Sequence, residues 1–319
     1  MSQDDAFAPD HDARPSPARA LVARLQQQET LNFWLTNRIP RNLLTRLVGR
    51  FSRIRSPRLT RWSIRVWRLF ADDLRLDESP AREFASLQEC FTRPLKPGAR
   101  PIAQGSDSIV SPCDAVIGAN GVVSAGTLLQ AKGMVYPLAE LLGDADWAEQ
   151  HRQGAYVTLR LKSSMYHRFH APCAGRIQRL RYVTGEVYNV NPPALKRIQR
   201  LFCRNERAAL SLHPCDDAPS GPITLVPVAA VLVSSMKFTF LAPHRHPASR
   251  ANRTIDLDTP VRRGQELGWF EHGSTIIVLA GPGLRLAPTL VEGRTVRMGE
   301  RLLVYPATHC VTDSESESV

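Results

Sequence analysis

FEHGSTIIVLAGPG, residues 270–283, begins as a turn and continues as a strand. Residues 272–275 have the composition of a tight turn, and 276–280 form a short apolar run typical of a buried strand. A Gly-Ser-Thr at a strand entrance is usually only a turn with a solvated hydroxyl. Short runs of this kind, bounded by Gly and Pro, recur along the second part of the chain and decide the predicted fold class.

From residue 93 onward the sequence predicts a β-rich domain that extends to residue 308. The density of strand-like runs favours an α+β fold that is mainly β, with a barrel or sandwich-hybrid catalytic domain. We expect one helical insertion, PLAELLGDADWAEQH at 137–151. The predicted strands are 155–161, 175–183, 208–213, 223–233, 274–280 and 300–305.

The chain before residue 93 has a different character. Residues 1–28 form a polar head that we expect to be disordered, and residues 29–92 read as helical and amphipathic. In SPAREFASLQECF, residues 79–91, Ser79 is the expected N-cap and Pro80 the first helical residue. At the other end, residues 309–319 form an acidic tail of low complexity, also expected to be disordered.

The charge of the chain is concentrated in this helical region. The formal net charge is +11, and residues 30–71 carry ten arginines and no acidic residue. Apolar residues recur between them at helical spacing, a pattern typical of helices that lie on an anionic bilayer. Two alternatives remain: that these helices simply pack on the core with solvated arginines, or that they bind nucleic acid. No nucleic-acid-binding motif accompanies them, so we expect no nucleic-acid partner.

Other sequence features limit the class of protein. No apolar run approaches the roughly 20 residues that span a bilayer, and we expect no secretory signal at the polar, acidic N-terminus. The six cysteines are scattered without a CxxC pair, which indicates reduced, mainly packing cysteines of an intracellular protein rather than disulfides or a zinc site.

Four residues stand apart as candidates for chemistry. Asp114 lies in a predicted turn, His167 and His170 follow the strand 155–161, and Ser274 opens the strand already quoted. The histidine pair lacks a third ligand at metal spacing, so we expect no metal. Asp, His and Ser in this chain order are able to form a nucleophile, a base and an orienting group. The GxSxG signature is missing, which argues against an α/β-hydrolase.

Longer motifs give a more specific indication. The chain resembles the bacterial, membrane-associated phosphatidylserine decarboxylases, with YHRxH and the late Gly-Ser-Thr after GQELGxF as the most diagnostic features. The matching stretches occur in family order over roughly residues 60–305. They are FTRPLKPGARPI (91–102), VSPCDAVIG (110–118), LLQAKGMVYPLAELLG (128–143), YHRFHAPCAGRI (166–177), GEVYNVNPPAL (185–195), LFCRNERA (201–208), VPVAAVLVSSM (226–236) and RGQELGWFEHGSTIIVLAGPG (263–283).

The resemblance implies that the chain cuts its own backbone. Asp114 would orient and polarise His170, which would take the proton of the Ser274 hydroxyl for attack on the Gly273 carbonyl. The resulting ester would break by β-elimination, leaving a large chain, 1–273, and a small chain, 274–319. Ser274 would become a pyruvoyl group, the covalent cofactor. Gly273, without a Cβ, would let the backbone bend for this attack.

The resemblance also implies the second reaction and its setting. The pyruvoyl carbonyl would form a Schiff base with the amine of phosphatidylserine and accept the electrons released as CO2 leaves, giving phosphatidylethanolamine. His167 and His170 are both candidates to return the proton. The expected partners are an anionic membrane surface and a second copy of the chain in a homodimer. The expected location is peripheral, on the cytoplasmic side of the inner membrane.

Two positions depart from the family pattern, and two other functions remain open. Ala115 stands where the family usually has Gly, and His272 stands where an apolar residue is usual; neither removes a residue that the mechanism needs. The first alternative function is a serine hydrolase that uses the same three residues without self-cleavage. The second is a non-catalytic lipid-binding module.

Overall fold

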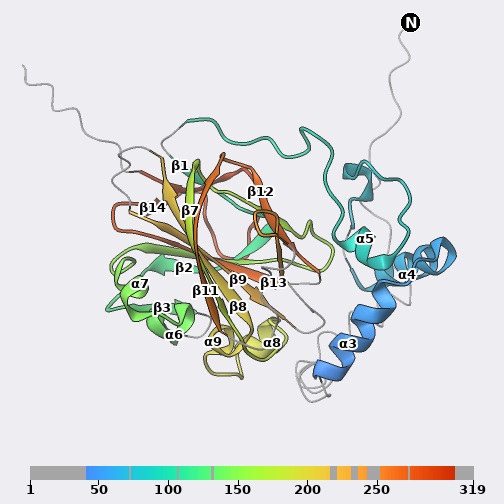
Figure 1. The fold of residues 1–319 in the computed structure, drawn as a ribbon, viewed down its shortest axis with the longest axis horizontal. Coiled ribbons are helices and arrows are strands. Elements are labelled where there is room, and N and C mark those ends of the chain that lie inside the picture. The colour runs from blue at the N-terminus through green and yellow to red at the C-terminus, as the bar shows by residue number, and fades with distance from the viewer. Residues whose placement is uncertain are drawn as a thin grey trace, which may run out of the picture.

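The computed structural model describes residues 41–71, 73–105, 108–130, 133–215, 221–230, 236–242, 252–271 and 274–305. The predicted polar head, the acidic tail and the pair His272–Gly273 lie outside these ranges. In Figure 1 the strands form the body of the molecule, helices α6 to α9 lie together along one side of it, and helices α3 to α5 lie apart from them at another edge.

An eight-stranded antiparallel sheet is the largest element. In spatial order it contains β11 (Arg253–Val261), β7 (Gly175–Val183), β8 (Arg207–Pro214), β9 (Ile223–Ala229), β13 (Ser274–Ala280), β5 (Ala155–Arg160), β2 (Ala115–Val122) and β15 (Thr295–Val296). Both faces of its centre are covered. Along β13, Ile276 and Val278 join one hydrophobic core, whereas Ile277 and Leu279 join a second core. This explains why the strand reads as a continuous apolar run instead of an alternating one.

Two small sheets and a hairpin complete the described strands. One sheet has the order β10 (Met236–Phe238), β12 (Glu266–Phe270), β6 (Arg168–His170), and the other β1 (Ser108–Val110), β16 (Arg301–Val304), β14 (Arg285–Leu286). The hairpin joins β3 (Thr127–Gln130) to β4 (Met134–Pro137). The first small sheet packs into the first core through three aromatic side chains, Phe169, Phe238 and Phe270. The ring centroids of Phe169 and Phe270 are 5.4 Å apart.

The α+β, mainly β class is therefore confirmed. The described strands form open sheets with no closed barrel among them, so the barrel or sandwich description stays a prediction.

Short helices border the second core. They are α6 (Leu138–Leu142), α7 (Ala145–Glu149), α8 (Pro192–Leu195) and α9 (Leu201–Arg204). The insertion expected as one helix over 137–151 is thus two helices. Gly143 ends the first with a left-handed backbone (φ 69°), and Asp144 caps the second by accepting from the Trp147 amide.

The described part of the N-terminal region, from residue 41, contains helices, one of which begins later than expected. It contains α3 (Arg41–Ser52), α4 (Pro57–Phe70), a 3-10 turn η1 (Leu76–Glu78) and α5 (Leu87–Phe91). Ser56 caps α4 and Pro57 is its first residue. The helix expected over 79–91 begins only at Leu87. Ser86 is its N-cap, and the Glu89 carboxylate accepts from the Ala85 amide, a reciprocal capping arrangement that fixes the start there.

Helices α3 and α4 turn much of their apolar surface to solvent. Small polar side chains, including Thr60 and Ser63, are buried, whereas Trp62 is 60% exposed. The other exposed large apolar residues of this region are Leu47, Phe51, Ile54 and Leu69. Among the described helices, none is long and apolar enough to cross a bilayer.

Candidate functional site

The histidine motif lies beside the strand that leads into the Gly-Ser-Thr segment. Strand β6 pairs antiparallel with β12, with Glu266 opposite His170 and Trp269 opposite Arg168. One residue further along, the Phe270 amide donates to the carbonyl of His167 (3.0 Å). The chain approaching residues 272–273 therefore runs directly alongside the two histidines.

His170 is held on both ring nitrogens. Nδ1 is 2.9 Å from the carbonyl oxygen of Gly264, and Nε2 is 2.9 Å from the hydroxyl of Tyr166. A carbonyl can only accept, so Nδ1 carries the proton and Nε2 of the neutral ring accepts from Tyr166. Burial lowers the pKa of His170, and the contact with the Gly264 carbonyl offsets this in part. The result is a neutral imidazole with a basic Nε2 at physiological pH.

The carbonyl that orients His170 depends on a glycine turn between β11 and β12. Gly264 has φ +76°, and a Cβ at this position would lie 2.1 Å from Cδ1 of Ile102. Its amide donates to the Ala171 carbonyl (2.8 Å), while its own carbonyl faces His170. Glycine is thus favoured by the left-handed backbone, and a Cβ here would also displace the end of the Ile102 side chain.

Asp114 lies on a segment adjacent to His170 but is bonded to other groups. The His170 amide donates to the carbonyl of Pro112 (2.8 Å), which brings the two segments together. Arg100 donates to the Asp114 carboxylate through Nε and through Nη2, the latter at 2.6 Å, and the Met298 amide adds a bond to Oδ1 (2.9 Å). The charge of Asp114 still acts on His170, since it raises the pKa of that ring.

Arg100 connects this carboxylate to the helical region. Its Nη2 also lies 2.6 Å from Oε2 of Glu78 in η1, and its side chain is only 3% exposed. Burial lowers the pKa of Arg100, but the hydrogen bonds to Asp114 and Glu78 outweigh it and the pKa is raised. Two carboxylates sharing one buried guanidinium form a fixed ionic group.

His167 is completely buried and stacked on an aromatic ring. Its Nδ1 lies 2.8 Å from the carbonyl of Met165, and its ring centroid is 3.9 Å from that of Phe91. Phe91 in turn stacks on Trp67 of α4, at 5.8 Å. A column of three rings therefore links the arginine-rich helix to the histidine motif.

Ser274 is placed through its backbone. It is the first residue of β13, where it pairs with Ala229 of β9. His272, Gly273 and the side chain of Ser274 lie outside what the structure describes. The described residues thus bring His167, His170 and Asp114 onto neighbouring segments and fix the chain immediately before and after the predicted cleavage pair.

Two buried polar atoms lie next to Ser274 without a hydrogen-bond partner among the described residues. They are Oγ1 of Thr275, which is fully buried, and Nε of Arg160. Thr275 and Arg160 are directly opposite each other on β13 and β5. Buried polar groups are normally paired, so this cross-strand pair has capacity to bind a further polar group.

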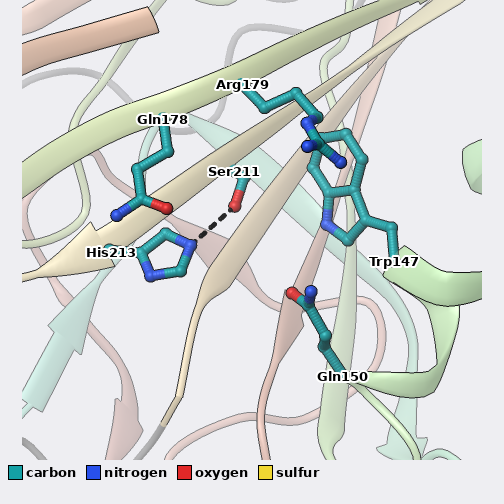
Figure 2. A pocket seen from close by; sticks show the side chains of 6 residues that line it. All are labelled: Trp147, Gln150, Gln178, Arg179, Ser211 and His213. Carbon is teal, nitrogen blue, oxygen red and sulfur yellow. Dashed lines mark hydrogen bonds between the residues drawn. The ribbon is translucent and has the colours of Figure 1, made fainter. Parts of the chain in front are cut away.

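A small pocket lies at the far end of the same sheet. It has a volume of about 160 Å³ and is lined by Trp147, Gln150, Gln178, Arg179, Ser211 and His213 (Figure 2). Nε2 of His213 is 3.1 Å from the Ser211 hydroxyl. The register separates this pocket from the candidate site, because Ser211 pairs with Thr224 whereas Ser274 pairs with Ala229. Among the described residues, no group of three or more His, Cys, Asp or Glu side chains could hold a metal.

Sequence reasoning did not single out Tyr166, Arg100 or Gly264. Tyr166 and Arg100 stand inside the motifs YHRFH and GARPI, so the motifs carried a signal for them. Gly264 likewise opens the motif GQELGxF, but its role depends on a turn and on its contact with Ile102, far away in the chain.

Comparisons with known proteins identify the family of this chain. A sequence model of the family "Phosphatidylserine decarboxylase" matches residues 87–304. Three similar proteins are each named phosphatidylserine decarboxylase proenzyme. The protein from Anaeromyxobacter sp. (strain K) is 41% identical over 279 residues, covering 83% of this chain and 94% of the relative. The one from Vibrio cholerae serotype O1 is 37% identical over 284 residues (85% and 95%). The one from Brevibacillus brevis is 37% identical over 277 residues (86% and 97%). This chain belongs to the phosphatidylserine decarboxylase family.

Proposed function

We propose that the chain is a proenzyme that cuts itself between Gly273 and Ser274 and then decarboxylates phosphatidylserine with a pyruvoyl group made from Ser274. The observation that supports this most strongly is the pairing of β6 with β12, which sets the histidine motif beside the chain entering residues 272–273. The proenzyme names of the relatives agree with it.

His170 acts as the base in self-cleavage, and Tyr166 carries the proton to it. The Ser274 hydroxyl gives its proton to the Tyr166 oxygen as the Tyr166 proton passes to Nε2 of His170. The Ser274 oxygen then attacks the Gly273 carbonyl, the Gly273–Ser274 C–N bond breaks as its nitrogen takes the proton back from His170, and the amide becomes an ester with a free amine on residue 274. Burial raises the pKa of Tyr166, so its hydroxyl keeps a proton to donate at neutral pH.

The ester breaks when the Ser274 α-proton is removed. The Cβ–O bond opens, Gly273 leaves as a free carboxylate, and the dehydroalanine left on residue 274 takes up water and releases ammonia. Asp114 contributes through its charge: fixed by Arg100 and the Met298 amide, it favours the imidazolium that forms on His170.

The residues around Ser274 fit the cofactor. A pyruvoyl group supplies an electron-accepting carbonyl for the amine of the substrate. His167, whose ring is buried against Phe91, is the candidate to hold or return a proton at the substrate carbon. Tyr166 and His167 both belong to the motif YHRFH, so in this proposal one motif supplies side chains for self-cleavage and for decarboxylation.

Helices α3 and α4 bring this site to an anionic bilayer. Their exposed apolar residues, Trp62 and Phe51 among them, stand among exposed arginines, a combination suited to the lipid–water interface. Between residues 41 and 71, the exposed arginines whose side chains the structure describes are 50, 53, 55, 58, 61, 65 and 68. We propose that the protein is peripheral, on the cytoplasmic side of the inner membrane, and that it forms a homodimer.

An assay of CO2 release tests the function. Protein incubated with vesicles containing phosphatidylserine labelled in the serine carboxyl is expected to release labelled CO2, and the Ser274→Ala chain none. Free serine in solution serves as the comparison substrate. A serine hydrolase would release fatty acid or glycerophosphoserine without CO2, and a lipid-binding module would release nothing; either result would refute the proposal.

A further inference from the structure

A buried carboxylate lies two residues before the proposed cleavage bond. The side chain of Glu271 is 6% exposed, and both of its oxygens are bonded. Arg53 donates to Oε2 at 2.8 Å, and the Gln88 amide donates to Oε1 at 2.7 Å. Nε of Arg53 also donates to the Gln88 side-chain oxygen, at 3.3 Å. The three side chains form a closed group, which we call the Glu271 clamp.

The clamp ties the cleavage segment to the helical region. Arg53 follows α3, and Gln88 lies in α5, so the residues are 218 and 183 positions away from Glu271 along the chain. A buried carboxylate is costly unless it is paired, and here Arg53 and Gln88, both from the helical region, are bonded to it. The position of Glu271 is therefore fixed by elements outside the β domain.

The backbone immediately before and after residues 272–273 is also held by hydrogen bonds. The Phe270 amide is bonded to the His167 carbonyl, and Ser274 pairs with Ala229. Residues 272–273 must span the distance between two anchored ends. Attack of a hydroxyl on the preceding carbonyl depends steeply on geometry, and a displacement of about 1 Å is able to cost roughly 100-fold in rate.

We propose that Arg53 and Gln88 are positioning residues for self-cleavage and act through Glu271. The helical region is then part of the processing machinery as well as a membrane contact. This inference rests on the proposed self-cleavage at Gly273–Ser274. It also predicts that chains lacking the helical contact are cut slowly even when the three triad residues are intact.

The test is a double-mutant cycle on the rate of cleavage. Chains made by pulse-labelled cell-free synthesis are followed by denaturing electrophoresis for Arg53→Met, Glu271→Met and the double variant. Each single substitution is expected to slow cleavage roughly 10-fold or more. The double variant is expected to be no slower than the slower single one, because both remove the same interaction. Arg53→Lys, which keeps the charge, is expected to recover part of the rate.

Arg82→Met is the matched control. Arg82 is an exposed cation in the loop before α5, in the same helical region as Arg53, and its replacement is expected to leave the rate within about twofold of the unsubstituted chain. Thermal unfolding of the same variants carrying Ser274→Ala measures whether each is folded, and rates are compared only among folded chains.

The outcomes separate the two proposals. If the unsubstituted chain is never cut, the proposed function fails. If it is cut, and Arg53→Met is cut equally fast, or is slowed no more than Arg82→Met, the inference fails and the proposed function stands. If the effects of Arg53→Met and Glu271→Met on the cleavage rate are fully additive in the double variant, the inference also fails.

Discussion

The carbonyl of Gly264 orients the His170 ring through Nδ1, and the lone pair on Nε2 accepts a hydrogen bond from the Tyr166 hydroxyl. In serine triads the carboxylate usually bonds directly to the ring, whereas here Gly264 occupies that position and Asp114 is bonded to Arg100. The tautomer is fixed equally well by a carbonyl. The difference is that Asp114 acts on His170 by charge alone in this arrangement.

Replacing Tyr166 by Phe tests the proton path. The change removes the hydroxyl that lies 2.9 Å from Nε2 of His170 and keeps the ring in its buried place. We expect self-cleavage to slow roughly 10- to 100-fold, because the relay of the proton to the base is lost. The rate is measured by the appearance of the small chain on denaturing gels.

Thermal unfolding of Tyr166→Phe in the Ser274→Ala background serves as the folding control. Cleavage at an unchanged rate would show that Tyr166 only packs against His170.

The pKa of His170 sets the pH dependence of self-cleavage. Burial lowers this pKa below the ordinary value of 6.5, so the ring stays neutral to lower pH than a solvent-exposed histidine. Protonation removes the basic Nε2. The cleavage rate is therefore expected to be level through neutral pH and to fall on acidification with a midpoint below 6.5.

The measurement is a pH–rate profile of freshly synthesised chains transferred to buffers of different pH. A midpoint above 6.5 would contradict the assignment of a buried, neutral His170 as the base.

Among the site residues, those in local motifs could be predicted from the sequence, whereas contacts between distant segments could not. Asp114, His167 and His170 could be identified because the motifs are local. The bonds of Asp114 to Arg100 and of Glu271 to Arg53 could not, because each depends on where a distant segment folds back.

Among the secondary-structure elements, long apolar strands were the easiest to predict. The predicted run 175–183 coincides with β7, and 274–280 with β13. Strands β2, β6 and β12 were missed. Strand β2 contains Gly and Asn that resemble a turn, and the other two have only five residues or fewer. The helix predicted over 79–91 was wrong because Ser86 and Glu89 provide a better cap than Ser79.

Membrane binding by helices α3 and α4 is the proposed role of a secondary-structure element that is easiest to test. Each arginine near an anionic surface contributes about 1 kcal/mol, and each buried apolar side chain adds to this. Replacing Phe51 and Trp62 together by Ser is expected to weaken binding to phosphatidylglycerol-containing vesicles roughly tenfold or more. Binding is measured by vesicle flotation at two salt concentrations.

Val291→Ser is the matched control, since Val291 is an equally exposed apolar residue outside these helices (62% exposed). Equal loss of binding in Val291→Ser, or binding that is insensitive to salt, would contradict docking through α3 and α4.

The molecule consists of a large sheet that is buried on both faces at its centre and a helical region, α3 to α5, at one end of it. Strand β13 lies in the interior of the eight-stranded sheet and is buried on both faces, so the strand that begins with Ser274 has a fixed position. The ring column through Phe91 and the Glu271 clamp both connect this region to the helices. The mainly β class followed from strand density in the sequence, whereas the open strand order depends on long-range pairing that periodicity does not encode.

Intact-mass measurement of the purified protein under denaturing conditions tests the central claim most directly. The account predicts two chains, one ending at Gly273 and one of 46 residues (319 − 274 + 1) that begins at position 274 with a pyruvoyl group and no free amine. The Ser274→Ala protein is expected to remain a single chain of about 35.5 kDa. An unsubstituted protein that stays whole at about 35.5 kDa while it still releases CO2 from phosphatidylserine would contradict the account.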